Sequence, residues 1–173
     1  EALLGASHII LPGVGAFADC RSGIGSIDGM LEALEHVVMA RGCPLLAICV
    51  GMQLLGTRSL ENGDHAGFDW ISGEVLPIPR KLGLPIPQMG WNDLVFHCDH
   101  PVTADLNNGD HAYFVHSFMF SSDDHSRVLA TVDYGAPINA IIMQDNIVGT
   151  QFHPEKSQAT GMKLIRNFLT WRP

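Results

Sequence analysis

The segment PLLAICVGMQLL, residues 44–55, constrains the possible fold more than any other stretch of the sequence. Its first half is too continuously apolar for a strand with one solvent-exposed face, so it predicts a strand buried on both faces, as in a parallel sheet. A cysteine and small residues follow, and residues 51–60, GMQLLGTRSL, have the pattern of a helix. We therefore expect a buried strand that turns directly into a helix.

Neighbouring segments continue this alternation. Residues 6–13, ASHIILPG, predict a short strand ended by Pro12 and Gly13, and residues 30–42, MLEALEHVVMARG, predict a helix with Gly42 as its C-cap. Later strands are predicted over residues 111–120, 127–135 and 138–152, with a hairpin turn at Asp145–Asn146 and an amphipathic helix over residues 159–171. The order of strands and helices indicates an α/β fold with its active site at the carboxyl ends of the strands.

Length and charge exclude several classes of function. No repeat or linker divides the 173 residues, so we expect one domain over residues 1–173. The net charge of −8, without a Lys/Arg cluster, argues against a nucleic-acid partner. Apolar runs such as HIIL and AIIM are too short to span a membrane, and no signal peptide is recognisable. The cysteines at 20, 43, 49 and 98 form no CxxC pair, which favours free thiols in the cytoplasm.

Cys49 is the first candidate catalytic residue. It lies between Ala47 and Gly51 at the predicted strand-to-helix turn, which is the layout of a nucleophile elbow. Such a turn exposes the thiol, points a helix N-terminus at the sulfur to favour the thiolate, and frees the backbone N–H of Val50 to hold an oxyanion. The alternative for this stretch alone is a buried cysteine of the core.

Two further motifs favour the catalytic interpretation. In QFHPEKS, residues 151–157, His153 and Glu155 are two residues apart in extended chain, so a carboxylate can orient an imidazole that serves as a base. An isolated HxE would be a solvated loop, but the elbow makes a nucleophile, base and orienting group the better interpretation. In LPGVGAF, residues 11–17, Gly13 and Gly15 allow the backbone to pass close to a substrate or to flip a peptide group.

Together these motifs resemble the class I (triad) glutamine amidotransferases. The segments LPGVGAF, ICVGMQLL, MGWN, YFVHSF and QFHPEKS have the order and spacing of that family from about Ala6 onward. The finer resemblance is to the glutaminase subunits of imidazole glycerol phosphate synthase, from histidine biosynthesis. The resemblance implies an α/β, flavodoxin-like fold with a mostly parallel sheet flanked by helices.

The resemblance also implies a role for each motif. Cys49 would attack glutamine, His153 would act as base and then acid, and Glu155 would orient His153. Val50 and, after a peptide flip in the Pro12–Gly15 loop, Val14 would hold the oxyanion. The implied glutamine pocket comprises Gly13, Gly15, Gly51, Gln53, His116, Ser117 and Phe118, and the implied interface comprises Trp91, Asn92 and Lys156. Neither cofactor nor metal is implied.

The implied partner is the cyclase subunit, which would form a heterodimer with this chain. Ammonia released from glutamine would pass directly into the cyclase. There it would react with a phosphorylated, ribulosyl-bearing aminoimidazole carboxamide nucleotide, yielding imidazole glycerol phosphate and an aminoimidazole carboxamide ribotide.

The chain departs from the family pattern at several points. Ala47 replaces the usual elbow glycine, and Gln88 and Phe118 stand where the family often has His and Tyr. The family also has an N-terminal strand, helix and strand before LPGVGAF that are absent here. A sheet without that inner strand would leave backbone groups unpaired, so the chain is expected to be a fragment.

Three rival interpretations remain open at this point. The chain could serve another amidotransferase, in pyridoxal phosphate or purine synthesis, or it could be an inactive regulatory module that keeps the interface. The third is a metal-binding protein using His97, Cys98 and His100 of HCDH, but that spacing does not match a zinc site and favours a loop.

Overall fold

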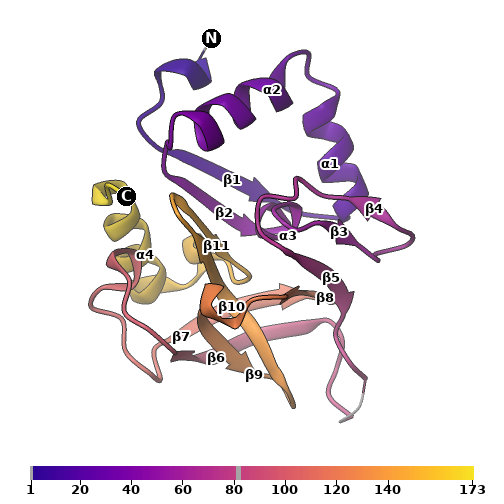
Figure 1. Cartoon of the computed structure of the whole chain (residues 1–173). Helices are drawn as coiled ribbons and strands as arrows, with labels where there is room; N and C mark the ends of the chain where they lie inside the picture. Colours follow the sequence, from indigo (N-terminus) through magenta and orange to yellow (C-terminus); the bar gives the residue numbers. More distant parts are fainter. Residues whose placement is uncertain (1, 81–82) are drawn as a thin grey trace.

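The computed structural model describes residues 2–80 and 83–173, which form two sheets with helices packed around them (Figure 1). The larger sheet has the strand order β1-β2-β11-β10-β9-β6-β7. Its strands are β1 (Ile9–Gly13), β2 (Leu45–Cys49), β6 (Gln88–Phe96), β7 (His111–His116), β9 (Val128–Asp133), β10 (Pro137–Gln144) and β11 (Ile147–Thr150). The predicted α/β class is confirmed.

The smaller sheet has the order β4-β3-β5-β8. Its strands are β3 (Arg58–Ser59), β4 (His65–Ala66), β5 (Gly73–Pro77) and β8 (Phe118–Ser122). The helices are α1 (Phe17–Gly25), α2 (Met30–Glu35, continued by a π-helix over His36–Ala40), α3 (Val50–Leu54) and α4 (Gln158–Thr170), with 3-10 turns at Ala2–Gly5, Pro101–Thr103, His125–Arg127 and Pro154–Lys156. Gly42 follows the π-helix with φ +67°, as its predicted C-cap role requires.

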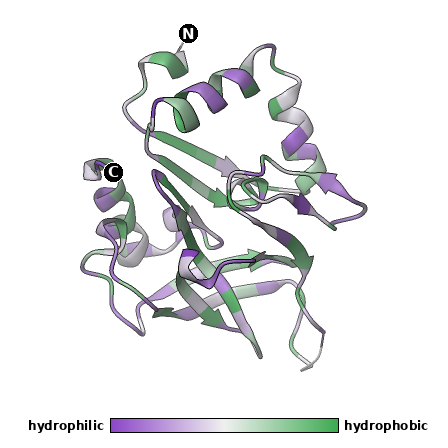
Figure 2. Cartoon of the chain, in the orientation of Figure 1, coloured by the Kyte–Doolittle hydropathy of each residue, from purple (hydrophilic) through white to green (hydrophobic). Residues whose placement is uncertain are grey.

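Strand β2 lies between two hydrophobic clusters. Leu45 and Ala47 face the cluster built with α1 and α2, and Leu46 and Ile48 face the cluster built with α4. This alternation is the period of two expected along a strand. All five residues of β2 are buried, which confirms the predicted strand without a wet face. Figure 2 shows β1 and β2 as mostly hydrophobic ribbons beneath α1 and α2.

The sheet is less parallel than expected from the resemblance. Among the described strands of the larger sheet, only β1, β2 and β11 run parallel to one another, whereas β10, β9, β6 and β7 pair antiparallel. Short connections are the physical reason for the β9–β10 and β10–β11 pairs, since a turn of two or three residues can join only antiparallel strands. The turn at Asp145–Asn146 between β10 and β11 is where the sequence predicts it.

The helix predicted over residues 51–60 is wrong in length, because α3 ends at Leu54. The backbone N–H groups of Phe68 and Trp70 bond to the carbonyls of Leu54 and Leu55. These bonds satisfy the free carbonyls of the helix end, which sequence periodicity does not reveal. The chain then continues into β3.

The single strand predicted over residues 111–120 is two strands, β7 and β8, which break at Ser117 and belong to different sheets. The carbonyl of Phe118 accepts hydrogen bonds from the side chains of His116 and Gln53. Tertiary contacts therefore hold the break in a stretch whose local pattern is continuously strand-like.

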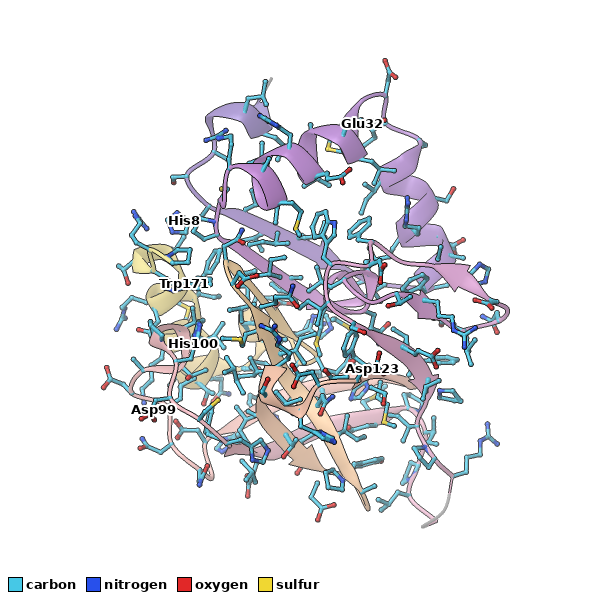
Figure 3. The ribbon with its side chains drawn as sticks, viewed as in Figure 1. His8, Glu32, Asp99, His100, Asp123 and Trp171 are labelled. Carbon is cyan, nitrogen blue, oxygen red and sulfur yellow. The ribbon has the colours of Figure 1, made fainter. Side chains whose placement is uncertain are left out.

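Side chains from the two ends of the described chain meet beside α4, as His8 and Trp171 show in Figure 3. His8 Nε2 lies 3.1 Å from the Trp171 carbonyl oxygen. His100 packs edge-on against the Trp171 ring at 5.1 Å, and its Nδ1 accepts from the N–H of Val102. Within residues 2–80 and 83–173, no group of three or more His, Cys, Asp or Glu side chains is placed to bind a metal ion. Nor does any helix of this part of the chain have the length and apolarity that crossing a membrane requires.

Candidate active site

Cys49 occupies a strained turn between β2 and α3. Its backbone has φ 55° and ψ −112°, a conformation that non-glycine residues rarely adopt. A Cβ on Gly51 would lie 2.1 Å from the carbonyl oxygen of Leu11, and a Cβ on Gly13 would lie 2.5 Å from the Gly51 nitrogen. The backbones of β1 and α3 thus approach closely enough to require glycine, and the strand-to-helix turn predicted from the sequence is present.

A pocket of about 370 Å³ opens at the carboxyl ends of β1 and β2. It is lined by Val14, Gly15, Cys49, Val50, Gln53, Glu61, Pro87, Val115, His116, Ser117, Phe118, His153 and Lys156. Ten of the residues singled out in the sequence therefore line one cavity. Gly13 and Gly51 support it from behind, through the backbone contacts described above.

His153 reaches the pocket because β11 runs beside β2. Thr150 is paired with Ile48, so the chain that follows β11 passes next to Cys49. His153 is 3% exposed, and its Nδ1 lies 2.8 Å from Oε1 of the exposed Glu155. A proton held between Nδ1 and this carboxylate leaves Nε2 with its lone pair as the basic nitrogen.

Three hydrogen bonds, two of them to Tyr113 of β7, fix the backbone of this catalytic loop. The N–H of His153 donates to the carbonyl of Tyr113, and the hydroxyl of Ser157 donates to the carbonyl of His153 at 2.7 Å. The Ser157 hydroxyl also accepts from the N–H of Tyr113. The loop is thereby tied to β7.

The expectation that the turn exposes the thiol is wrong, because Cys49 is 4% exposed, although it lines the pocket. The turn favours the thiolate through the N–H of Val50, as expected, but burial outweighs this effect. Burial raises the pKa of Cys49 to about 11, and the charge of Glu155 adds to the rise. The N–H of Val50 and the charge of Lys156 act in the opposite direction but do not cancel it. Helix α3 has only five residues, so its dipole is small. A neighbouring base must therefore remove the proton when the thiol reacts.

The loop after β1 lies at the mouth of the pocket. Val14 is 74% exposed and Gly15 has φ +92°, which glycine adopts without strain. The carbonyl of Val14 accepts a hydrogen bond from the thiol of Cys20 at 3.2 Å.

His116 is held neutral on the other wall. Burial lowers the pKa of His116 to about 4, and Nδ1 lies 2.8 Å from the Phe118 carbonyl, so the single ring proton is on Nδ1. Nε2 is then an acceptor and lies 2.9 Å from Oε1 of Gln88, which is an acceptor as well. The NH₂ of Gln88 must turn toward Nε2, and this supplies the partner that its nitrogen otherwise lacks. His116 can therefore shape the pocket but is a poor base near neutral pH.

Glu61 also lines the pocket, although the sequence analysis did not identify it. Its Oε2 accepts a hydrogen bond of 2.8 Å from the N–H of Phe17, at the start of α1. Glu61 lies in a polar loop with no motif around it, so no sequence signal distinguishes it. The tertiary structure places this carboxylate opposite the thiol-bearing turn.

The expected interface residues lie outside the cavity, except for Lys156. Trp91 is 46% exposed on β6 and packs edge-on against Tyr113. The side chain of Asn92 donates to the carbonyl of Asp133, so it stabilises the β6–β9 pairing. Exposed Met89 and Trp91 nevertheless leave an apolar surface on β6.

Comparison with known proteins places these features in one family. Residues 3–171 match the family described as glutamine amidotransferase class-I. The chain is 54% identical to imidazole glycerol phosphate synthase subunit HisH of Rhodospirillum rubrum, covering 100% of this chain and 82% of that protein. It is 53% identical to the subunit of the same name from Cereibacter sphaeroides, covering 97% and 80% of the two chains.

Solved structures share the fold at low identity. A crystal structure described as glutamine amidotransferase superposes with a TM-score of 0.70 at 18% identity, covering 95% of this chain and 78% of the other. A glutamine amidotransferase from Thermotoga maritima gives a TM-score of 0.66 at 17% identity, covering 96% and 64%. These two similarities concern the fold alone.

Proposed function

Because this chain belongs to the class-I glutamine amidotransferase family, we propose that it is the glutaminase subunit of imidazole glycerol phosphate synthase. It hydrolyses glutamine to glutamate and ammonia in histidine biosynthesis. The observation that carries the proposal is that Cys49 and His153 line one pocket, while Glu155 binds Nδ1 of the His153 imidazole through its carboxylate.

The reaction begins with proton transfer from Cys49 to Nε2 of His153. The sulfur then attacks the amide carbon of glutamine, and the N–H of Val50 holds the oxygen that becomes negative. His153 returns the proton to the leaving nitrogen, ammonia departs, and a thioester remains on Cys49. Water activated by His153 hydrolyses the thioester to glutamate, and Glu155 stabilises the imidazolium in both halves of the cycle.

Glu61 is suited to the ammonium group of glutamine. It is the carboxylate that lines the pocket, and its bond to the N–H of Phe17 fixes one oxygen and leaves the other available. An ammonium placed there gains a charge-assisted hydrogen bond in a partly desolvated site. The side-chain amide of the substrate would then extend toward Cys49.

The variant Glu61→Gln is expected to raise KM for glutamine by about 10- to 100-fold, since hydrogen bonds to charged groups contribute about 1.5–3 kcal/mol. Gln keeps an oxygen for the Phe17 N–H, so the loop should stay in place. Steady-state kinetics test this, with Glu35→Gln at the exposed end of α2 as the matched control. An unchanged KM would show that Glu61 does not contact the substrate.

The partner is a cyclase subunit, which meets the exposed face of β6. Met89 and Trp91 offer apolar surface there, and Lys156 is an exposed residue that lines the pocket. Ammonia in water near neutral pH is mostly ammonium, which is not nucleophilic, so a dry passage between subunits would keep it reactive. The loop from Pro12 to Gly15 would turn the N–H of Val14 toward the oxyanion when the acceptor is bound.

Glutamine hydrolysis is expected to be slow for this chain alone and faster with the cyclase and its nucleotide ligand. A glutaminase assay of the chain alone, with the cyclase, and with the cyclase and its nucleotide ligand measures this directly. Equal rates in all three would contradict coupling, and no hydrolysis in any would support the inactive regulatory module. Activation by a component of pyridoxal phosphate or purine synthesis instead would support another amidotransferase.

A cytoplasmic location is consistent with the proposed glutaminase function. The cysteines at positions 20, 43, 49 and 98 are all free thiols in the structure. A reducing compartment would keep the Cys49 thiol available for catalysis.

A further inference from the structure

A chain of buried side-chain amides leads to the sulfur of Cys49. Nε2 of Gln151 lies 3.8 Å from Sγ, and Nε2 of Gln53 lies 3.1 Å from Oε1 of Gln151. Nε2 of Gln53 also lies 3.0 Å from the carbonyl oxygen of Phe118. Gln53 is 3% exposed and Gln151 is fully buried, so water does not compete for these contacts.

The hydrogen bonds define which way each amide faces. Both N–H groups of Gln53 point at acceptors, namely the carbonyl of Phe118 and the side-chain oxygen of Gln151. The oxygen of Gln151 is therefore engaged, and its NH₂ faces the other way, toward Sγ. A sulfur atom accepts such a bond weakly as a thiol and more strongly as a thiolate.

Strand register explains why Gln151 is in this place. Thr150, the last residue of β11, is paired with Ile48 of β2, and the two strands run parallel. The residues that follow this pair, Gln151 and Cys49, therefore lie side by side. The N–H of Gln151 bonds to the carbonyl of Ala140, which fixes its backbone on the β10 side. Gln151 lies two residues before His153, which lines the same pocket as Cys49.

We propose that Gln151 stabilises the thiolate of Cys49 by donating its side-chain N–H to the sulfur, and that Gln53 positions Gln151 for this role. The inference rests on the proposed function in one respect, that Cys49 is the nucleophile. The thiolate forms when the proton moves to His153 and disappears when the thioester bond forms, so the donor is needed most in that interval.

The surroundings of the sulfur make a neutral donor useful. The titratable groups around Cys49 are His153, Glu155 and Lys156 after β11, Cys20 on α1, Glu61 after β3 and His116 on β7. Glu155 and Cys20 disfavour the thiolate, as burial does, and the favourable groups are Lys156 and the N–H of Val50. An amide N–H stabilises the thiolate against the effect of burial. Because the amide is not a base, it does not compete with His153 for the thiol proton.

The test is Gln151→Met, which keeps the approximate volume and removes the donor. We expect the pKa of Cys49 to rise by about one pH unit and kcat for glutamine hydrolysis to fall about tenfold, with a smaller change in KM. Iodoacetamide labelling of Cys49, followed by mass spectrometry at a fixed pH below the pKa, reports the thiolate. Its rate should fall about threefold, because a tenfold loss of thiolate is partly offset by the greater nucleophilicity of a more basic sulfur.

Two controls separate this role from a structural one. Thr150→Val removes a buried hydrogen bond, from the Thr150 hydroxyl to the Phe152 carbonyl, and should leave Cys49 labelling unchanged. Labelling of Cys20 in the same samples reports access, and a loosened loop would speed it. If Gln151→Met melts below the assay temperature, Gln151→Asn takes its place, since it withdraws the amide from the sulfur and predicts the same change.

The labelling results distinguish support for the proposed role of Gln151 from its refutation. Slower Cys49 labelling with unchanged Cys20 labelling supports the proposal. Unchanged Cys49 labelling in a folded Gln151 variant overturns it, while the proposed glutaminase function stands as long as Cys49→Ser eliminates hydrolysis by the parent protein. Hydrolysis that survives Cys49→Ser would instead remove Cys49 as the nucleophile, and the absence of hydrolysis by the parent protein would refute the function itself.

Discussion

Replacing Cys49 with alanine is expected to abolish glutamine hydrolysis, with a loss of at least about 10⁴-fold in kcat, because no other group in the pocket can form the thioester. The thiol of Cys49 is 4% exposed and alanine is smaller, so the fold should tolerate the change. Synthesis of imidazole glycerol phosphate from free ammonia by the complex should continue, since the cyclase supplies that chemistry. Both activities can be measured on the same complex.

Cys98→Ala provides the matched control, since that thiol is exposed and lies away from the pocket. It should leave both activities at the parent level. Loss of the ammonia-dependent reaction in the Cys49→Ala complex would contradict the proposed division of labour between the two proteins. Retained glutamine hydrolysis would remove Cys49 from the mechanism.

Replacing Gly161 with alanine is expected to destabilise the protein by about 3 kcal/mol or more, which corresponds to a fall in Tm of roughly 10 °C. A Cβ at this position would lie 1.8 Å from the carbonyl oxygen of Pro154, a backbone atom that cannot move alone. Pro154 separates His153 from Glu155, so any protein that still folds should have a displaced base. Glutamine hydrolysis should therefore fall together with stability.

Gly23→Ala is the matched control for this second prediction. Gly23 lies in α1, and a Cβ there would meet no atom within 4 Å. Alanine favours the helix by up to about 1 kcal/mol over glycine, so Tm should rise slightly and activity should not change. Thermal unfolding followed by circular dichroism checks both variants, and an unchanged Tm for Gly161→Ala would show that α4 can move away from the catalytic loop.

Much of the fold could be predicted because its signals are local. The unbroken apolar run of β2, the helical spacing that ends at Gly42 and the turn at Asp145 are each contained within a few residues. Burial on both faces, helix periodicity and turn chemistry act at that range. The helix wrongly extended beyond Leu54 and the strand broken at Ser117 are cases in which distant hydrogen bonds override the local pattern.

In the active site, too, some features follow from short motifs and others depend on tertiary contacts. Cys49, His153 and Glu155 could be singled out from the sequence, because the elbow and the HxE spacing are short motifs whose geometry follows from the backbone. The protonation state of Cys49 could not, because burial by the rest of the chain raises its pKa against the effect of the turn.

The α/β class, the strand-to-helix turn and the residue types that carry chemistry follow from the amino-acid sequence alone, since each of these depends on neighbours along the chain. The position of Glu61 in the pocket, the neutral state of His116 and the orientation of Gln151 toward the sulfur follow from tertiary contacts. Register between β2 and β11 and desolvation by several distant segments produce these arrangements. Such contacts join residues up to about a hundred positions apart, as the separation of 102 positions between Cys49 and Gln151 illustrates, and no local pattern encodes them.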